Sequence, residues 1–267
     1  MKIITSSKNI KIKEINKLRK SNKRKKENLF IIEGKKEIDL AKKSGICVKE
    51  LFFLENVYGE ELNSFSGITK NSVADEVFKK ISFRENPDGY LAIAQSKNFQ
   101  LKNIKLSKNP FLLILEAIEK PGNLGAILRS ADAAGIDAVI ITEPKTDIFN
   151  PNVIRSGLGT IFTNQIAICK NKELFSWLKE KNINTFAATP NTDNFYCGSN
   201  FKNSLALVIG AEHEGLSKEW LEFADNKIKI PMNGKIDSLN ASASAAIILF
   251  EVVRQRKPRN NLKKTAI

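Results

Sequence analysis

A nearly uninterrupted apolar run over residues 111–117 (FLLILEA) sets the strongest limit on the fold of this chain. A strand that is apolar on both faces is typical of a parallel sheet with helices on both sides. A helix is predicted over 123–134, ending at Gly135, and an apolar strand follows at 138–142. This order of strand, helix and strand predicts an α/β domain with a mainly parallel sheet.

The alternation continues toward the C-terminus, and a smaller α/β unit precedes the apolar run. In the larger domain, further strands are predicted at 183–188, 205–210 and 227–230, with helices at 171–181 and 240–256. In the smaller unit, helices are predicted at 9–20, 34–44 and 72–80, with strands at 30–32, 48–54 and 90–95. The predicted division is a basic arm and small domain over 1–95, a linker over 96–109, the larger domain over 110–256 and a basic tail over 257–267.

Positive charge is concentrated at the two ends of the chain. Residues 1–26 contain eleven Lys or Arg and one acid, and 254–267 contain six Lys or Arg and no acid. The formal net charge is +14, so the residues between these ends carry −2. A near-neutral body with basic ends favours a polyanionic partner such as nucleic acid over solvated lysine-rich tails, because neutralised phosphates release their counterions.

Composition excludes several other classes of protein. No run of 18 uncharged apolar residues occurs, so no membrane span is expected, and the basic start lacks the apolar core of a secretory signal. The three cysteines are far apart and lack CxxC spacing, which argues against a disulfide framework or a zinc site. A cytoplasmic protein without a metal is therefore expected.

Three short segments are predicted at the carboxyl ends of strands, where open α/β sheets bind their ligands. They are Asn123–Arg129 (NLGAILR), Gly210–Gly215 (GAEHEG), and Ile230–Met232 (IPM) followed by 238–242 (SLNAS). Each also has a structural explanation. Asn123 can cap a helix, Arg129 can extend to solvent, the glycine-rich segment can be a plain turn, and Ser238 or Asn240 can cap the last helix.

His213 is the only histidine in the chain. A metal site would need further His or paired Cys ligands, and a nucleophilic triad would need a suitably placed Ser or Cys. The sequence supplies neither, so His213 is not assigned a role.

In this order and spacing, the three segments resemble those of the SpoU-type (TrmH-like) SPOUT methyltransferases, which methylate ribose 2'-hydroxyls of RNA. The segments that carry the resemblance are NLGAILRSADAAG, IGAEHEGLS and IPMNGKIDSLNASASAAI, within residues 108–256. The N-terminal part, including FIIEGKKEIDLAKKSG, is similar to the L30e-like substrate-binding domain that often precedes this methyltransferase domain.

The resemblance implies a fold, a cofactor and an assembly. The fold is a parallel α/β sheet with a C-terminal trefoil knot over about 205–256, a feature that pattern analysis cannot reveal. The cofactor is S-adenosylmethionine, bound in the knot of a homodimer. The family's cofactor-holding backbone positions correspond to Thr189, Gly210, Ile230 and Leu239.

The resemblance also implies a polar active site. Its positions correspond to Asn123, Arg129, Glu212, Ser238 and Asn240. Arg129 is often described as the base in this family, but a guanidinium is too weak a base for that role. We expect Arg129 to hold the ribose or phosphate and stabilise negative charge on oxygen, while Glu212 orients Arg129 or an asparagine.

The sequence leaves the RNA substrate open. The N-terminal domain and basic arm favour ribosomal RNA over transfer RNA. The alternatives are a transfer RNA 2'-O-methyltransferase, a SPOUT enzyme that methylates a base, and a non-catalytic RNA-binding protein on the same fold. The complete set of five polar positions argues against the non-catalytic alternative. The Asn123 and Arg129 pair, together with the SLN segment at 238–240, favours ribose over base.

Overall fold

The computed structural model describes residues 3–57 and 59–256, so the predicted basic tail over 257–267 lies outside the described residues. The chain forms two compact units. Unit 1 comprises the chain up to Asn98 together with Asp147–Thr163, and unit 2 comprises Phe99–Thr146 and the chain from Asn164 onward. The predicted boundaries differ from these units, because they place 147–163 in the larger domain.

Unit 1 is built on a four-stranded mixed sheet of strand order β1-β4-β2-β3. Its strands are β1 (Leu29–Glu33), β2 (Val48–Leu54), β3 (Thr69–Val73) and β4 (Tyr90–Gln95). Its helices are α1 (Ile10–Leu18), α2 (Ser21–Glu27), α3 (Lys35–Lys43), the 3₁₀ helix η1 (Gly59–Phe65), α4 (Asp75–Ile81) and α6 (Pro151–Ser156). The prediction of a helix over 72–80 is wrong at its start, because residues up to Val73 pair with β2 and the helix begins only at Asp75.

The N-terminal basic segment is part of the core of unit 1. The Asn9 side chain accepts a hydrogen bond from the Lys11 backbone N–H and so caps α1. Ile12, Ile15 and Leu18 follow at helical spacing and are fully buried against strands of the sheet. The predicted helix over 9–20 is therefore present, shortened to α1. Its Lys13 and Lys17 lie on the exposed side, while Lys11 pairs with Glu50 of β2.

A buried ion pair joins α2 to the segment Asp147–Thr163 within unit 1. Arg24 lies 2.6 Å from Asp147 through Nη2 and donates from Nε to the same oxygen at 2.7 Å. Its remaining nitrogen, Nη1, donates to the backbone carbonyls of Leu18 and Arg19. The Arg24 side chain is 3% exposed and that of Asp147 is 12% exposed.

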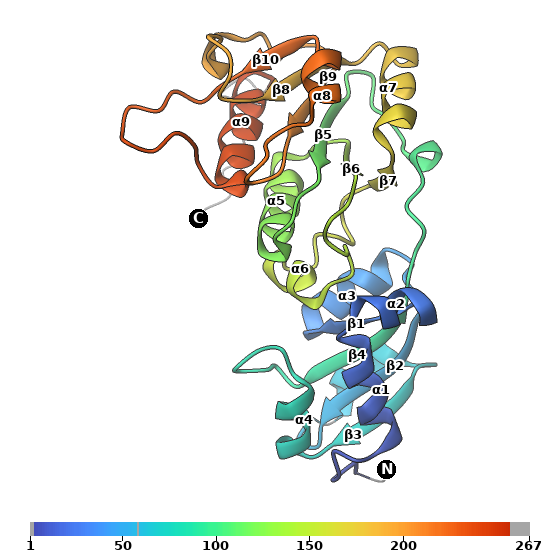
Figure 1. Cartoon of the computed structure of the whole chain (residues 1–267). Helices are drawn as coiled ribbons and strands as arrows, with labels where there is room; N and C mark the ends of the chain where they lie inside the picture. Colours follow the sequence, from blue (N-terminus) through green and yellow to red (C-terminus); the bar gives the residue numbers. More distant parts are fainter. Residues whose placement is uncertain (1–2, 58, 257–267) are drawn as a thin grey trace. The chain divides into compact units, whose positions relative to one another are not determined.

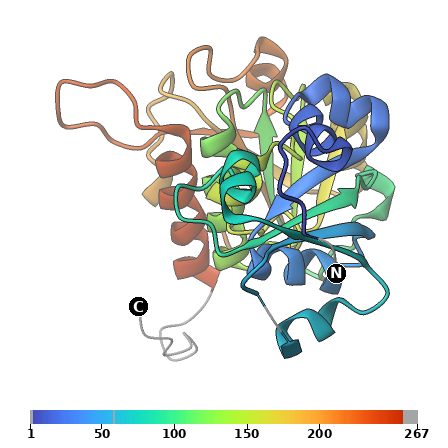
Figure 2. The same ribbon diagram turned by 90° about the horizontal axis from the view of Figure 1, so that it is seen from below.

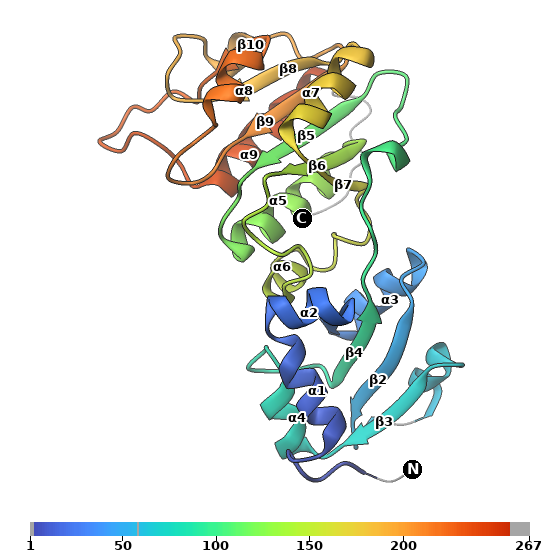
Figure 3. The ribbon, with the colours of Figure 1, turned by 45° about the vertical axis from the view of Figure 1, so that its right-hand side comes forward.

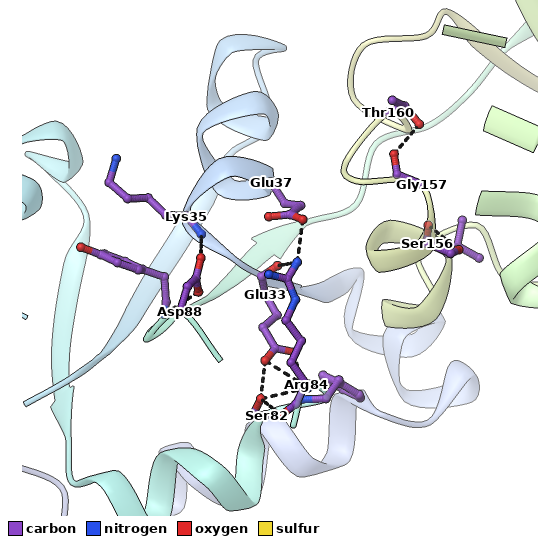
Figure 4. A network of polar contacts seen from close by, with 12 residues as sticks. Glu33, Lys35, Glu37, Ser82, Arg84, Asp88, Ser156, Gly157 and Thr160 are labelled. Atoms are coloured by element: carbon purple, nitrogen blue, oxygen red, sulfur yellow. Dashed lines mark hydrogen bonds and ion pairs between the residues drawn. The ribbon is translucent and has the colours of Figure 1, made fainter. Parts of the chain in front are cut away.

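Further contacts attach the segment 147–163 to the rest of unit 1. The Phe149 ring stacks on Phe30 of β1 with centroids 4.2 Å apart. Gly159, at φ +78°, packs so closely against α3 that a Cβ there would lie 3.2 Å from Leu40. Figure 4 shows the neighbouring network, in which Arg84 pairs with the buried Glu37 at 2.6 Å. These contacts explain why 147–163 is grouped with unit 1.

Unit 2 is a six-stranded, fully parallel sheet of order β10-β8-β9-β5-β6-β7. Its strands are β5 (Phe111–Glu116), β6 (Ala138–Thr142), β7 (Ile166–Cys169), β8 (Asn184–Ala188), β9 (Leu205–Ile209) and β10 (Asn226–Ile228). Its helices are η2 (Leu101–Asn103), α5 (Pro121–Ala134), α7 (Asn171–Glu180), η3 (Tyr196–Gly198), α8 (Lys218–Phe223) and α9 (Ala241–Arg256). The predicted α/β class with a parallel sheet is confirmed.

Helices cover both faces of this sheet, as the apolar run at 111–117 predicts. Leu112 and Ile114 of β5 pack in one core cluster with residues of α7 and α8, while α5 and α9 lie side by side over the other face (Figures 1 and 3). Within the predicted linker, Leu101 is buried in the same cluster. The segment between β10 and α9 extends away from the rest of unit 2 (Figure 2). None of the described helices is long and apolar enough to cross a membrane.

Candidate active site

The segment after β9 forms a tight loop whose two ends are bonded to each other. Ala211 and Gly215 exchange two backbone hydrogen bonds of 3.0 Å. Gly210 lies so close to the returning chain that a Cβ would stand 2.3 Å from the carbonyl carbon of Gly215. No residue larger than glycine can occupy position 210 in this loop. The loop presents Glu212 at the carboxyl edge of the sheet.

Glu212 bonds to the segment that follows the adjacent strand, β5. Asn123 donates from Nδ2 to Glu212 Oε1 at 2.5 Å, and the Glu119 backbone N–H lies 3.3 Å from Oε2. The alternative explanation that Asn123 caps the helix does not hold, because α5 begins at Pro121, whose fixed φ suits the first helical position. Asn123 is the third residue of α5, and its side chain is therefore available to Glu212.

Asn240 completes a chain of hydrogen bonds that runs in a single direction. Its Oδ1 accepts the Ser242 backbone N–H at 2.9 Å, so Asn240 caps α9. Of the two residues predicted as possible caps of the last helix, Ser238 and Asn240, it is the second that forms the cap. Its Nδ2 then donates to Asn123 Oδ1 at 3.2 Å. The carboxylate of Glu212 at one end and the helix N–H at the other determine how both amides are oriented. Glu212, Asn123 and Asn240, which come from three distant segments, thus form one hydrogen-bonded row.

The Glu212 carboxylate is stabilised in its ionised form. Desolvation alone would raise the pKa of Glu212, but hydrogen bonds from Asn123 and from the backbone N–H groups of Glu212, Glu119 and Lys120 outweigh it. The pKa of Glu212 therefore lies below its ordinary value of 4.5. A carboxylate that stays ionised at neutral pH serves as a fixed acceptor that orients Asn123.

The other two predicted polar residues are not joined to this row. Arg129 is exposed on α5, and no residue within the described ranges forms a hydrogen bond or ion pair with it. Of the two predicted partners of Glu212, it is the asparagine that forms the contact. Ser238 is exposed and bonds to its neighbour Asp237 at 3.1 Å. Both side chains are thus available to a ligand.

The predicted cofactor positions lie along the same edge of the sheet. The Thr189 backbone N–H donates to the Ile228 carbonyl at 2.9 Å, so the ends of β8 and β10 lie together, with Ile230 two residues further on. Leu239 and Ile236 are large apolar side chains that are exposed in the segment before α9. Exposed apolar side chains and free backbone groups at strand ends are the kinds of group that hold an adenosine-containing ligand.

Glu119 and Glu116 also belong to this region, and neither was singled out from the sequence. The backbone of Glu119 bonds to Glu212 and, through its carbonyl, to the Thr146 hydroxyl. Glu116, the last residue of β5, is buried and accepts from the Ser217 backbone N–H at 2.8 Å. A charged residue that ends an otherwise apolar strand is the one signal that could have indicated it. In the part of the chain that the structure describes, no cluster of three or more His, Cys, Asp or Glu residues suits a metal ion.

Comparisons with known proteins give this site a context. Residues 110–250 match the SpoU rRNA Methylase family, and residues 9–92 match the MRM3-like substrate binding domain. The Bacillus subtilis 23S rRNA (guanosine(2553)-2'-O)-methyltransferase RlmP is 30% identical over 253 residues, which is 94% of this chain and 99% of that protein.

Two solved structures are similar over nearly the whole chain. An RNA 2'-O ribose methyltransferase is 37% identical with a TM-score of 0.84, covering 95% of this chain and 99% of the other. An AdoMet-bound rRNA methyltransferase from Sinorhizobium meliloti is 28% identical with a TM-score of 0.86, covering 95% and 97%.

Fold, site and comparisons together define an RNA 2'-O-methyltransferase that uses S-adenosylmethionine, and the prediction of this class of enzyme is confirmed. The chain belongs to the SpoU rRNA methylase family. The preference for ribosomal over transfer RNA is confirmed by the same family match.

Proposed function

We propose that this enzyme methylates the ribose 2'-hydroxyl of a guanosine in 23S ribosomal RNA, in the cytoplasm. The observation that carries the proposal is the hydrogen-bonded row of Glu212, Asn123 and Asn240, which unites three distant segments at the carboxyl edge of the sheet. The similarity to an enzyme named for guanosine 2553 of 23S rRNA extends over 94% of the chain, both units included, and motivates the same nucleotide as the target.

The test is a map of ribose methylation in total RNA from cells with and without the gene. The proposal expects one guanosine of 23S rRNA to lose its 2'-O-methyl group in the deletion strain, and to regain it when the gene returns. An unchanged 23S rRNA, or a loss confined to transfer RNA, would contradict it.

The backbone at Thr189, Gly210, Ile230 and Leu239 would hold S-adenosylmethionine. When bound, the cofactor supplies an activated methyl group on a sulfonium leaving group. The protein's contribution is position and charge. Arg129 would hold the ribose or phosphate and stabilise negative charge on the 2'-oxygen, since a guanidinium is too weak a base to accept the proton. The proton would leave to water or phosphate.

Asn123, Ser238 and Asn240 would form a polar wall around the ribose. The single-direction row gives Asn123 and Asn240 defined orientations before substrate arrives. Ser238 precedes Asn240 in the extended segment before α9 and would close the wall from that side. A preorganised set of polar groups lowers the reorganisation that the transition state requires.

Cofactor binding should occur without metal and should depend on Gly210. We expect calorimetry in excess chelator to detect S-adenosylmethionine binding to the wild-type protein. Gly210→Ala should abolish the binding heat, because its Cβ would lie 2.3 Å from the Gly215 backbone and would open the loop. Gly122→Ala is the matched control, since a Cβ there meets no atom within 4 Å. Wild-type affinity in Gly210→Ala would contradict this assignment.

The finer description of the fold is also a proposal. The domains would be a basic arm with an L30e-like domain over 1–95, a linker over 96–109 and a knotted SPOUT domain over 110–256, with the knot between about 205 and 256. Support for the knot comes from family membership and from the return of α9 to pack beside α5. Support for the N-terminal assignment comes from the substrate-binding domain match at 9–92.

A homodimer is the expected assembly. Ile247 and Phe250 are large apolar side chains that remain exposed on α9. Light scattering at tens of micromolar should give about twice the chain mass of 29.9 kDa. Phe250→Glu should shift the protein toward monomer, whereas the same change at exposed Lys218 should not. A wild-type monomer that methylates RNA at the normal rate would refute the dimer.

The exposed lysines of α1 and α2 should bind RNA phosphates and leave cofactor affinity unchanged. Deleting the arm would also remove Ile12, Ile15 and Leu18 from the core, so charge replacement is the sharper test. Changing Lys13, Lys17, Lys25 and Lys26 to Gln should reduce the slope of log K against log salt by about 3, at roughly 0.7–0.9 per phosphate contact. An unchanged slope would show that these lysines do not contact RNA.

A further inference from the structure

A buried polar network links the end of β5 to the first residues of α7 and α8. The Glu116 side chain accepts the Asn171 amide through Oε1 at 2.9 Å and the Ser217 backbone N–H through Oε2 at 2.8 Å. Asn171 in turn accepts the indole N–H of Trp220 at 2.9 Å. Glu116 is 3% exposed, Asn171 is 4% exposed and Trp220 is fully buried. Polar groups buried to this degree are costly unless they are paired.

The chemistry of this network requires a carboxylate at position 116. The Trp220 indole is only a donor, so the Asn171 oxygen must face it and the Asn171 amide nitrogen must face Glu116. The second partner of Glu116, the Ser217 backbone N–H, is also only a donor. A glutamine at 116 would therefore place its own amide N–H against one of two donors, neither of which can reverse.

The network contacts the loop that carries Glu212. Ser217 ends the segment 210–217 that carries Glu212, two residues beyond Gly215, and its side chain caps α8 by accepting from the Trp220 backbone N–H. At its other end the loop continues from β9 through Gly210, and Ala211 is bonded across it to Gly215. Glu116 and Glu119, which approach the loop at Ser217 and at Glu212, both belong to the chain around the end of β5.

We propose that Glu116 is a positioning residue for methyl transfer: its bond to the Ser217 N–H anchors the 210–217 loop to β5 and so sets Glu212 against Asn123. The proposal rests on the function proposed above. Glu116 is buried and its side chain bonds to Asn171 and Ser217, so it would act through the loop. Its effect should therefore fall on the rate of transfer and on the order of the loop, with little effect on RNA affinity.

A matched pair of variants at Ser217 isolates the anchoring bond. Ser217→Pro replaces the N–H that points at Glu116 with a ring carbon, so it removes the bond and displaces the Glu116 carboxylate, at a residue whose φ of −61° already suits proline; it also removes the hydroxyl cap. Ser217→Ala removes only the hydroxyl. We expect Ser217→Pro to slow single-turnover methyl transfer on the order of 10- to 100-fold relative to Ser217→Ala, as misplaced catalytic geometry does. Glu116→Leu, which removes both acceptor oxygens, should slow the transfer as Ser217→Pro does.

Two readouts separate positioning from stability. Amide exchange over residues 211–216 should accelerate in Ser217→Pro and remain slow in Ser217→Ala, with β5 protected in both. Asn171→Ala disturbs the same network but keeps the Ser217–Glu116 bond, so it should lower the melting temperature without the loss of rate. Equal rates in the two Ser217 variants, or equal exchange over 211–216, would overturn the proposal.

A double-mutant cycle tests whether Glu116 acts through Glu212. Glu212→Ala should lower the rate by itself, and adding Ser217→Pro to it should cost much less than in the wild type, because coupled residues are not additive. Full additivity would refute the route through Glu212. The proposed function would instead be contradicted by a wild-type protein that transfers no methyl group, or by a Glu212→Ala variant at the wild-type rate. In either case the exchange data would still show whether Glu116 anchors the 210–217 loop.

Discussion

Arg129→Ala should slow single-turnover methyl transfer to the cognate RNA on the order of 10²–10³-fold, the range for removing one charge-stabilising donor. S-adenosylmethionine affinity should stay unchanged, because the groups expected to hold the cofactor lie in other segments. The guanidinium is exposed on α5, and the described residues supply it with no partner. Its removal therefore breaks no internal contact, and a rate loss would report on the substrate.

Lysine should not replace Arg129. A lysine ammonium is a point charge, whereas the guanidinium is a planar fork that matches a phosphate or a ribose oxygen pair. Rate and cofactor affinity must be measured in parallel for Arg129→Ala and Arg129→Lys. A lysine variant at the wild-type rate would refute the assigned role. A rate that collapses together with cofactor affinity would make Arg129 a structural residue.

Arg24→Met should destabilise unit 1 by about 3–5 kcal/mol, the range for removing one partner of a buried ion pair. Asp147 would keep the Ser21 hydroxyl and the Phe149 backbone N–H as donors but lose its counter-charge, and the Leu18 and Arg19 carbonyls would lose the Arg24 donor. Lys25→Met is the control, since Lys25 is the next residue of α2 and is exposed. The double change Arg24→Met with Asp147→Leu should recover part of the loss, because no unpaired carboxylate remains.

The measurement must report on unit 1 alone. Both tryptophans, Trp177 and Trp220, lie in unit 2, so intrinsic tryptophan fluorescence follows the wrong part of the chain. Hydrogen exchange of β1 and β4 follows unit 1 directly. Protection of these strands that is equal in Arg24→Met and Lys25→Met would show that the ion pair contributes little.

Strands whose hydrophobic pattern is local were predicted well. β6 has the predicted bounds, and β5 and β9 each end one residue earlier than predicted. Predictions failed where a distant partner decides the structure. Residues 69–73 carry a polar pattern, but they form β3 because they extend the sheet beside β2. The short helix α6 and strand β7 were not predicted at all.

The active-site segments were recognised from their residue types and their order along the sequence. Strands β5 and β9 bring two of these segments together. These strands are neighbours in the parallel sheet, so the loops that follow them meet at one edge. The direction of the hydrogen bonds was not predictable. That Glu212 bonds Asn123 and leaves Arg129 free depends on α5 beginning at Pro121, two residues before the predicted start.

The sequence by itself determined the class of fold, the position of the strand-end segments and the basic character of the N-terminus, because each depends on residues close together in the chain. The tertiary structure alone decided which charges are buried. Arg24 is one of eleven cations in residues 1–26, but among those that the structure describes it alone pairs with Asp147, 123 residues away. Glu116 ends an apolar strand and is buried between two fixed donors, the Asn171 amide and the Ser217 N–H. A charged side chain can be buried only where residues distant in the sequence supply its partners. The pattern of residues adjacent in the sequence does not show which distant residues these are.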